Sequence, residues 1–163
     1  MQESTSFYKE KIILLDLNFT LVVNSAGEYP FTKKIIEAER YRQWLVEALK
    51  DNTVIIITVR NVQWKILTLE MIHKHTNWQP TDVYFPLGFE HGGAPPTKEK
   101  GLNDYILPKY GTDVSKYLAL ESNPKTTLMY SKLGIKAMTQ SQFKKELENP
   151  TKTEKVTEFY DKS

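Results

Sequence analysis

A single carboxylate, Asp16, ends a run of apolar residues near the start of the chain, KIILLD at 11–16. Asn18 and Thr20 follow at spacings of two and four, before apolar residues resume at Leu21. A carboxylate at the end of a buried strand can serve as a nucleophile or as a ligand of a divalent cation. An amide two residues later can form hydrogen bonds but cannot act as an acid or a base. The stretch therefore predicts a site at the end of a strand, and this site contains one acidic residue, Asp16, and not two.

Apolar runs and helical patterns alternate along the rest of the chain. The expected strands cover 11–15, 53–57, 82–85, 115–120 and 135–138. The expected helices cover 33–50, 61–76, 98–109, 124–133 and 141–147. The helix over 61–76 has an apolar stripe at Val62, Ile66, Leu69 and Ile72. Asn61 is expected to cap this helix, and Thr97 is expected to cap the helix over 98–109. The alternation predicts an α/β fold: a three-layer, Rossmann-like parallel sheet of about five strands with helices on both faces.

Polar side chains follow several of these strands, and in parallel sheets ligands bind beyond the carboxyl ends of the strands. Lys98 stands near the start of the helix that follows the third strand. We therefore expect polar groups from four segments to meet at one edge of the sheet. The residues concerned are Asp16, Thr58, Arg60, Lys98, Glu121 and Ser122.

The amino-acid composition of the chain limits the classes of function that it can have. The chain has 163 residues, 40% of them hydrophobic and 26% charged, which is typical of a single globular domain. We expect that domain over 1–148, with a polar tail over 149–163. The lack of cysteine excludes disulfides, thiolate nucleophiles and thiolate zinc sites. The net charge of +2 lends no support to a nucleic-acid partner and leaves one open.

Neither a signal peptide nor a membrane segment is expected. The first ten residues are polar, with acidic and basic groups mixed. Apolar runs stay well short of the roughly 20 residues that span a bilayer. The sequence therefore predicts a cytoplasmic protein without a membrane partner.

The polar segments, in this order, resemble the haloacid dehalogenase superfamily of phosphohydrolases. DLNFT at 16–20 resembles the first motif of that family, Asp-x-Asp-x-Thr/Val. IIITVR places Thr58 at the second motif, and PPTKEKGL offers Lys98 for the third. ESNPKT at 121–126 resembles the fourth motif, which usually carries an acidic pair. The resemblance extends over about residues 11–138.

The resemblance implies a Mg²⁺-dependent phosphohydrolase that acts on a phosphorylated substrate through an aspartyl-phosphate on Asp16. Thr58 would bind the phosphoryl oxygens, Lys98 would offset their charge, and Arg60 is a further candidate for a phosphate contact. The implied metal ligands are Asp16, the backbone carbonyl of Asn18, Glu121 and Ser122. Lys100 competes with Lys98, and we favour Lys98 because its spacing from Leu102 puts it on the sheet-facing side of the helix.

The chain departs from the family pattern at two positions. The family's second acid, which acts as general acid and base, is replaced by Asn18, and such a group contributes about 10²–10⁴-fold in rate. Ser122 stands where the family usually has a metal-binding Asp. Three interpretations stay open: a slow or specialised phosphohydrolase, a silent relative that binds a phosphorylated ligand or partner, or an Asp-to-Asn substitution made to trap a ligand. The third interpretation does not explain why Ser122 replaces the metal-binding Asp of the family.

Both places where the family inserts a cap domain are short in this chain, within 17–32 and around 86–96. The resemblance therefore implies a capless member with minimal cover over an open site. Open sites in the family tend to take macromolecular ends or large substrates, or they use a partner as a lid. The expected substrate is thus a phosphorylated small molecule or a phosphorylated macromolecular end.

Overall fold

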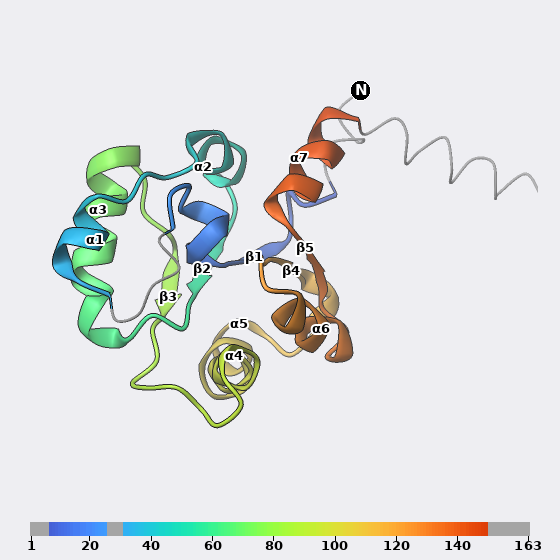
Figure 1. Ribbon diagram of the computed structural model, residues 1–163. Coiled ribbons are helices and arrows are strands. Elements are labelled where there is room, and N and C mark those ends of the chain that lie inside the picture. Colours follow the sequence, from blue (N-terminus) through green and yellow to red (C-terminus); the bar gives the residue numbers. More distant parts are fainter. Residues whose placement is uncertain (1–6, 26–30, 150–163) are drawn as a thin grey trace, which may run out of the picture.

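The computed structural model describes residues 7–25 and 31–149. A five-stranded parallel sheet lies at its centre, with the strand order β3-β2-β1-β4-β5 (Figure 1). The strands are β1 (Ile12–Leu15), β2 (Val54–Ile57), β3 (Asp82–Tyr84), β4 (Tyr117–Leu120) and β5 (Lys136–Met138). Helices cover both faces, which confirms the predicted α/β architecture.

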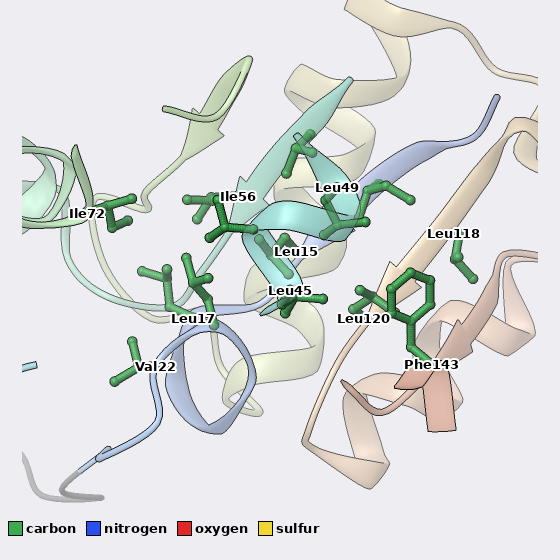
Figure 2. Close-up of a cluster of buried hydrophobic side chains, with 14 of the residues drawn as sticks. Leu15, Leu17, Val22, Leu45, Leu49, Ile56, Ile72, Leu118, Leu120 and Phe143 are labelled. Atoms are coloured by element: carbon green, nitrogen blue, oxygen red, sulfur yellow. The ribbon is translucent and has the colours of Figure 1, made fainter. Parts of the chain in front are cut away.

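Alternate residues of each strand point to opposite faces, and each face has its own apolar core. Ile13 and Leu15 of β1 pack on one face with Ile56, Leu118 and Leu120. This core is covered by α2 (Gln43–Leu49), α3 (Lys65–Thr76) and α7 (Gln140–Glu148). Figure 2 shows the side chains from these helices, among them Leu45, Leu49, Ile72 and Phe143, against those of the strands.

The other face is covered by a continuous helical segment and by α6 (Pro124–Lys132). That segment runs through α4 (Ala94–Gly101), the π-helix Leu102–Ile106 and α5 (Leu107–Tyr110). Leu14, Ile55 and Ile57 of the strands pack here against Leu102 and Ile106. In Figure 1, α4 and α5 lie below the sheet, while α2 and α7 lie above it. The central strands are thus buried on both sides, as near-continuous apolar runs require.

The helix predicted over 33–50 is two helices in the structure, α1 (Lys33–Glu37) and α2. The residues between them pair instead with the segment that follows β1. The N–H of Val23 donates to the carbonyl of Arg40, and the N–H of Arg42 donates to that of Leu21. These bonds hold the chain extended at 40–42 and end the helical run.

The predicted apolar stripe of the next helix is wrong at two positions. Ile72 is buried as expected, but Val62 is 36% exposed and Ile66 is 72% exposed. The helix starts with a 3₁₀ turn, Val62–Trp64, before α3 proper, and the tighter turn changes which residues share a face. The cap at Asn61 is as predicted, since its side chain accepts a hydrogen bond from the N–H of Gln63.

The predicted N-cap at Thr97 is also wrong, because α4 begins earlier, at Ala94. Pro95 and Pro96 occupy its first turn, where the missing N–H groups have no intrahelical partner to lose. Thr97 lies inside the helix, and its hydroxyl donates to the carbonyl of Gly93. The earlier start places Lys98 in the second turn of α4.

The C-terminal elements follow the prediction closely. Asn123 caps α6, and Gly134 adopts a φ of 84° just beyond it, the left-handed conformation expected of a residue that ends a helix. The predicted polar tail lies beyond Asn149, outside the described residues. Within the described ranges, no helix has the length and apolar character needed to span a bilayer.

The substitution Gly101→Ala is expected to destabilise the fold, because a β-carbon there would lie 2.6 Å from two ring atoms of Tyr84. Overpacking of this kind lowers the free energy of unfolding by about 1–3 kcal/mol. Urea denaturation measures the change. Gly88→Ala is the matched control, because a β-carbon there meets nothing within 4 Å. A Gly101→Ala variant as stable as the wild type would contradict this packing.

Candidate functional site

Asp16 follows β1, the central strand, and the residue is 6% exposed. It lines a pocket of about 180 Å³ at the carboxyl edge of the sheet. All but one of the predicted site residues line the pocket, and the exception is Arg60. The predicted residues that line it are Asp16, Asn18, Thr58, Lys98, Glu121 and Ser122.

Lys98 joins two carboxylates at the floor of this pocket. Its Nζ lies 2.8 Å from Asp16 Oδ1 and 2.6 Å from Glu121 Oε1, and its side chain is buried. Lys100 pairs instead with Asp104 at 3.1 Å on the exposed side of the helical segment. The structure therefore places Lys98, and not Lys100, against Asp16.

The charges of this cluster shift the pKa of both partners of the Lys98–Glu121 pair. Burial acts to lower the pKa of Lys98, but the carboxylates of Asp16 and Glu121 outweigh burial and raise it. The amine therefore stays charged. Burial raises the pKa of Glu121 to about 7, with Lys98 opposing the shift and Asp16 adding to it. Burial is the main cause, because it disfavours the charged form of the Glu121 carboxyl, and the neighbouring Asp16 carboxylate acts in the same direction.

The second oxygen of Asp16 faces a group of hydroxyls. Thr20 Oγ1 and Ser122 Oγ each donate to Asp16 Oδ2 at 2.9 Å. Ser122 Oγ also lies 3.1 Å from the backbone carbonyl oxygen of Asn18. A carboxylate, a carbonyl and a hydroxyl oxygen from two segments thus converge, and oxygen ligands of this kind are those that Mg²⁺ prefers.

Glu121 does not belong to this oxygen group, although the sequence predicted it as a metal ligand. Its Oε1 faces Lys98, and its Oε2 accepts hydrogen bonds from the N–H groups of Ser122 and Asn123, both at 3.0 Å. In the part of the chain that the structure describes, no three His, Cys, Asp or Glu residues gather as metal ligands would. The oxygen group therefore contains one acid, Asp16.

Arg60 is completely buried and does not line the pocket, whereas the sequence left it open between a phosphate contact and a solvated side chain. Its guanidinium forms an ion pair with Glu39, with Nη2 lying 2.6 Å from Oε2. Nη1 donates to Thr68 Oγ1 at 3.0 Å, and Nη2 donates to Asn18 Oδ1 at 3.0 Å. The predicted phosphate contact is not supported by this geometry, because the guanidinium is committed to Glu39, Thr68 and Asn18.

The same network fixes how Asn18 faces the pocket. The amide oxygen is directed at Arg60, so the amide NH₂ group is turned away from the guanidinium. Thr58 lines the pocket beside it, and its hydroxyl oxygen accepts a hydrogen bond from the N–H of Arg60 at 3.0 Å. The hydroxyl proton of Thr58 is then free to be donated to a ligand.

Four residues of the site were missed by sequence reasoning. Thr20 was visible as part of DLNFT but was given no role, whereas Glu39 lies in a segment that read as continuous helix. Thr126 lines the pocket with a buried Oγ1 that makes no hydrogen bond to any described residue. Phe19 lines the pocket mouth in a left-handed conformation, for which the sequence offers no glycine as a signal.

Comparison with known proteins identifies structures of similar fold but does not assign the chain to a family. No family model matches the chain, and no curated protein matches it in sequence. Two solved structures are similar in fold, one described as the Pnkp1/Rnl/Hen1 RNA repair complex and the other as the Pnkp1/Rnl/Hen1 complex. Each has a TM-score of 0.65 over 80% of this chain, at 15% and 14% identity respectively. The chain covers 42% and 45% of theirs, so it corresponds to less than half of each.

The raised pKa of Glu121 predicts how stability depends on pH. Its ordinary value is 4.5 and its folded value is about 7, so between these values the folded state holds a proton that the unfolded chain releases. This contribution to stability is complete below the unfolded value and is lost as pH rises through the folded one. In Mg²⁺-free buffer, the free energy of unfolding is expected to fall over this interval. The decrease of the free energy of unfolding with pH should be smaller in the Glu121→Gln variant.

Urea denaturation at a series of pH values provides the measurement. Glu47→Gln is a matched control, since Glu47 is an exposed glutamate on α2 that pairs with Lys50 at the surface. The control should keep the wild-type slope over the interval. An identical slope in Glu121→Gln and in the wild type would show that the proton is bound elsewhere.

Proposed function

We propose that the protein is a Mg²⁺-dependent phosphohydrolase of the haloacid dehalogenase type, with Asp16 as the nucleophile. The observation that carries the proposal is the environment of Asp16. Its carboxylate ends the central strand, lines a pocket of about 180 Å³, and is held by a buried ammonium on one oxygen and by hydroxyls on the other. A carboxylate fixed in this way can attack phosphorus and form an aspartyl-phosphate.

The residues around Asp16 suit the two steps of this reaction. In the first step a carboxylate oxygen bonds to phosphorus as the bond to the leaving oxygen breaks. Lys98 offsets the charge of the nucleophile and of the transferring phosphoryl group, and the hydroxyl of Thr58 donates to a phosphoryl oxygen. In the second step water attacks the phosphoryl group, releases inorganic phosphate and restores Asp16.

The oxygens around Ser122 fit a magnesium ion. Asp16, the carbonyl of Asn18 and the Ser122 hydroxyl would hold it, and Mg²⁺ commonly binds through one or two carboxylates with water completing its shell. The ion supplies positive charge that stabilises the phosphoryl oxygens. Because Asp16 is the one acid in the group, we expect weaker metal binding than in a site with an acidic pair. Glu121 is assigned here to holding Lys98.

Turnover is expected to be slow, because Asn18 can neither protonate the leaving oxygen nor activate water. The NH₂ group of its amide can donate a hydrogen bond to a leaving oxygen, but no proton is transferred. Arg60 is assigned to positioning Asn18, because it holds the amide oxygen from below the pocket. Substrates with good leaving groups should react best, since they depart without an acid.

The proposed substrates are phosphate monoesters at macromolecular ends, and nucleic-acid ends in particular. A pocket of about 180 Å³ has room for a phosphoryl group but would leave most of a large substrate outside. The two solved structures described above are complexes of Pnkp1, Rnl and Hen1, one of them described as an RNA repair complex. The similarity in fold to these complexes supports a phosphorylated nucleic-acid end as the substrate, rather than an unrelated small molecule.

A second candidate function is phosphate binding without turnover. Asn18 favours it, because the amide is held firmly in the place where the family has its acid and base. The same pocket would then bind a phosphorylated ligand or partner. The two functions differ in one observable: only the first releases inorganic phosphate.

A phosphatase assay with an aryl phosphate and Mg²⁺ tests the proposal. We expect slow, Mg²⁺-dependent release of phosphate by the wild type and none by Asp16→Asn, which removes the nucleophile. Asn18→Asp should be faster by about 10²–10⁴-fold, because it restores an acid and base. Arg60 would favour the ionised form of that aspartate, which is the form that activates water, so the gain should be present at neutral pH.

Lys98→Met and Lys100→Met form the matched pair for this assay. Both remove a lysine ammonium from α4, but only Lys98 contacts Asp16. Lys98→Met should lose activity, whereas Lys100→Met should keep that of the wild type. Folded wild-type protein and folded Asn18→Asp that both fail to release phosphate would exclude the phosphohydrolase. Phosphate-dependent thermal stabilisation of those inactive proteins would then support the second function.

A further inference from the structure

Phe19 combines an aromatic side chain with a backbone conformation that bulky residues rarely adopt. Its φ is 62° and its ψ is 4°, in the left-handed region. There the β-carbon crowds the backbone, so the conformation is unfavourable for a bulky residue, and residues held in it are concentrated at active sites and ligand sites. The fold therefore keeps Phe19 in this place against a local preference.

The turn around Phe19 is anchored on both sides, and the ring itself is directed outward. Leu17, Thr20 and Leu21 are completely buried, whereas Phe19 is 51% exposed. The N–H of Phe19 donates to Ser25 Oγ at 2.7 Å, which secures the unusual backbone. The exposed ring is absent from both apolar cores, so packing of the core does not explain an aromatic residue at this position.

The pocket beside Phe19 is too small to enclose a whole substrate. Its volume is about 180 Å³, below the roughly 300–1,000 Å³ of pockets that enclose a drug-sized ligand. A phosphoryl group at Asp16 would occupy part of it, and a nucleotide-sized substrate would extend out of the pocket. Among the described residues that line the pocket, Phe19 is the one aromatic side chain.

We propose that Phe19 is a stacking platform for a nucleobase that is joined to the phosphate bound at Asp16. The inference rests on the phosphate site proposed above and adds the class of substrate. Stacking of a base on an exposed aromatic ring contributes substantially to the binding of single-stranded nucleic acids and tolerates any base. It also explains why a strained phenylalanine stands where a glycine would be favoured locally.

Isothermal titration calorimetry with matched probes tests the proposal in the presence of Mg²⁺. Adenosine 5′-monophosphate and ribose 5-phosphate differ only in the base, and inorganic phosphate reports on the phosphate site alone. We expect wild-type protein to bind the nucleotide about tenfold or more tightly than ribose 5-phosphate. The ratio should fall close to one in Phe19→Gly and Phe19→Leu and should be retained in Phe19→Tyr.

Ile66→Ala is the matched control, because Ile66 is an exposed apolar residue of α3 that does not line the pocket. It should keep the wild-type ratio. Phe19→Gly should also raise the urea midpoint, because glycine adopts a positive φ without strain. A lowered midpoint would indicate a structural role for the ring and would contradict the proposal.

The remaining outcomes separate this inference from the function on which it rests. Equal affinity of wild-type protein for the nucleotide and for ribose 5-phosphate would overturn the stacking platform and leave the phosphate site standing. A preference for the nucleotide that persists in Phe19→Gly and Phe19→Leu would also overturn it. If no probe binds, inorganic phosphate included, both the phosphate site and the platform are excluded.

Discussion

Two buried carboxylates share one buried ammonium at the carboxyl edge of the sheet, and the placement of three segments depends on this contact. Lys98 of α4 holds Asp16 after β1 and Glu121 after β4. Removing one partner from such a group leaves an uncompensated buried charge, at a cost of about 3–5 kcal/mol. The ammonium that docks α4 on the two strands is also the cation beside the proposed nucleophile. The fold and the proposed chemistry therefore depend on the same ion pair.

A second buried ion pair, between Arg60 and Glu39, holds the guanidinium that positions Asn18. Arg60 comes from the segment after β2, and Glu39 from the segment after α1. Their contact holds the guanidinium under the pocket, where it receives the amide oxygen of Asn18. An amide satisfies this arrangement without any change of protonation. The contact thus holds the amide of Asn18 in place, and we expect the reaction to be slow because that amide is neither an acid nor a base.

The sequence predicted the sheet well because its strands are short apolar runs, buried on both faces, with polar residues at their carboxyl ends. Helical spacing from Leu102 also identified Lys98 correctly as the lysine that lies at Asp16. It could not predict features that depend on distant contacts. The partner of Arg60 lies 21 residues away, in a segment held extended by residues after β1. The left-handed backbone of Phe19 is imposed by its buried neighbours and by Ser25, without a local signal.

Acid-quenched mass spectrometry of the intact protein, after incubation with an aryl phosphate and Mg²⁺, tests the central claim most directly. The aryl leaving group departs without an acid, whereas Asn18 provides no base for the second step, so the aspartyl-phosphate should accumulate. We predict a covalent adduct with the mass of one phosphoryl group that maps to Asp16 and is absent from Asp16→Asn. Release of phosphate without any adduct on Asp16, or an adduct that persists in Asp16→Asn, would contradict the account.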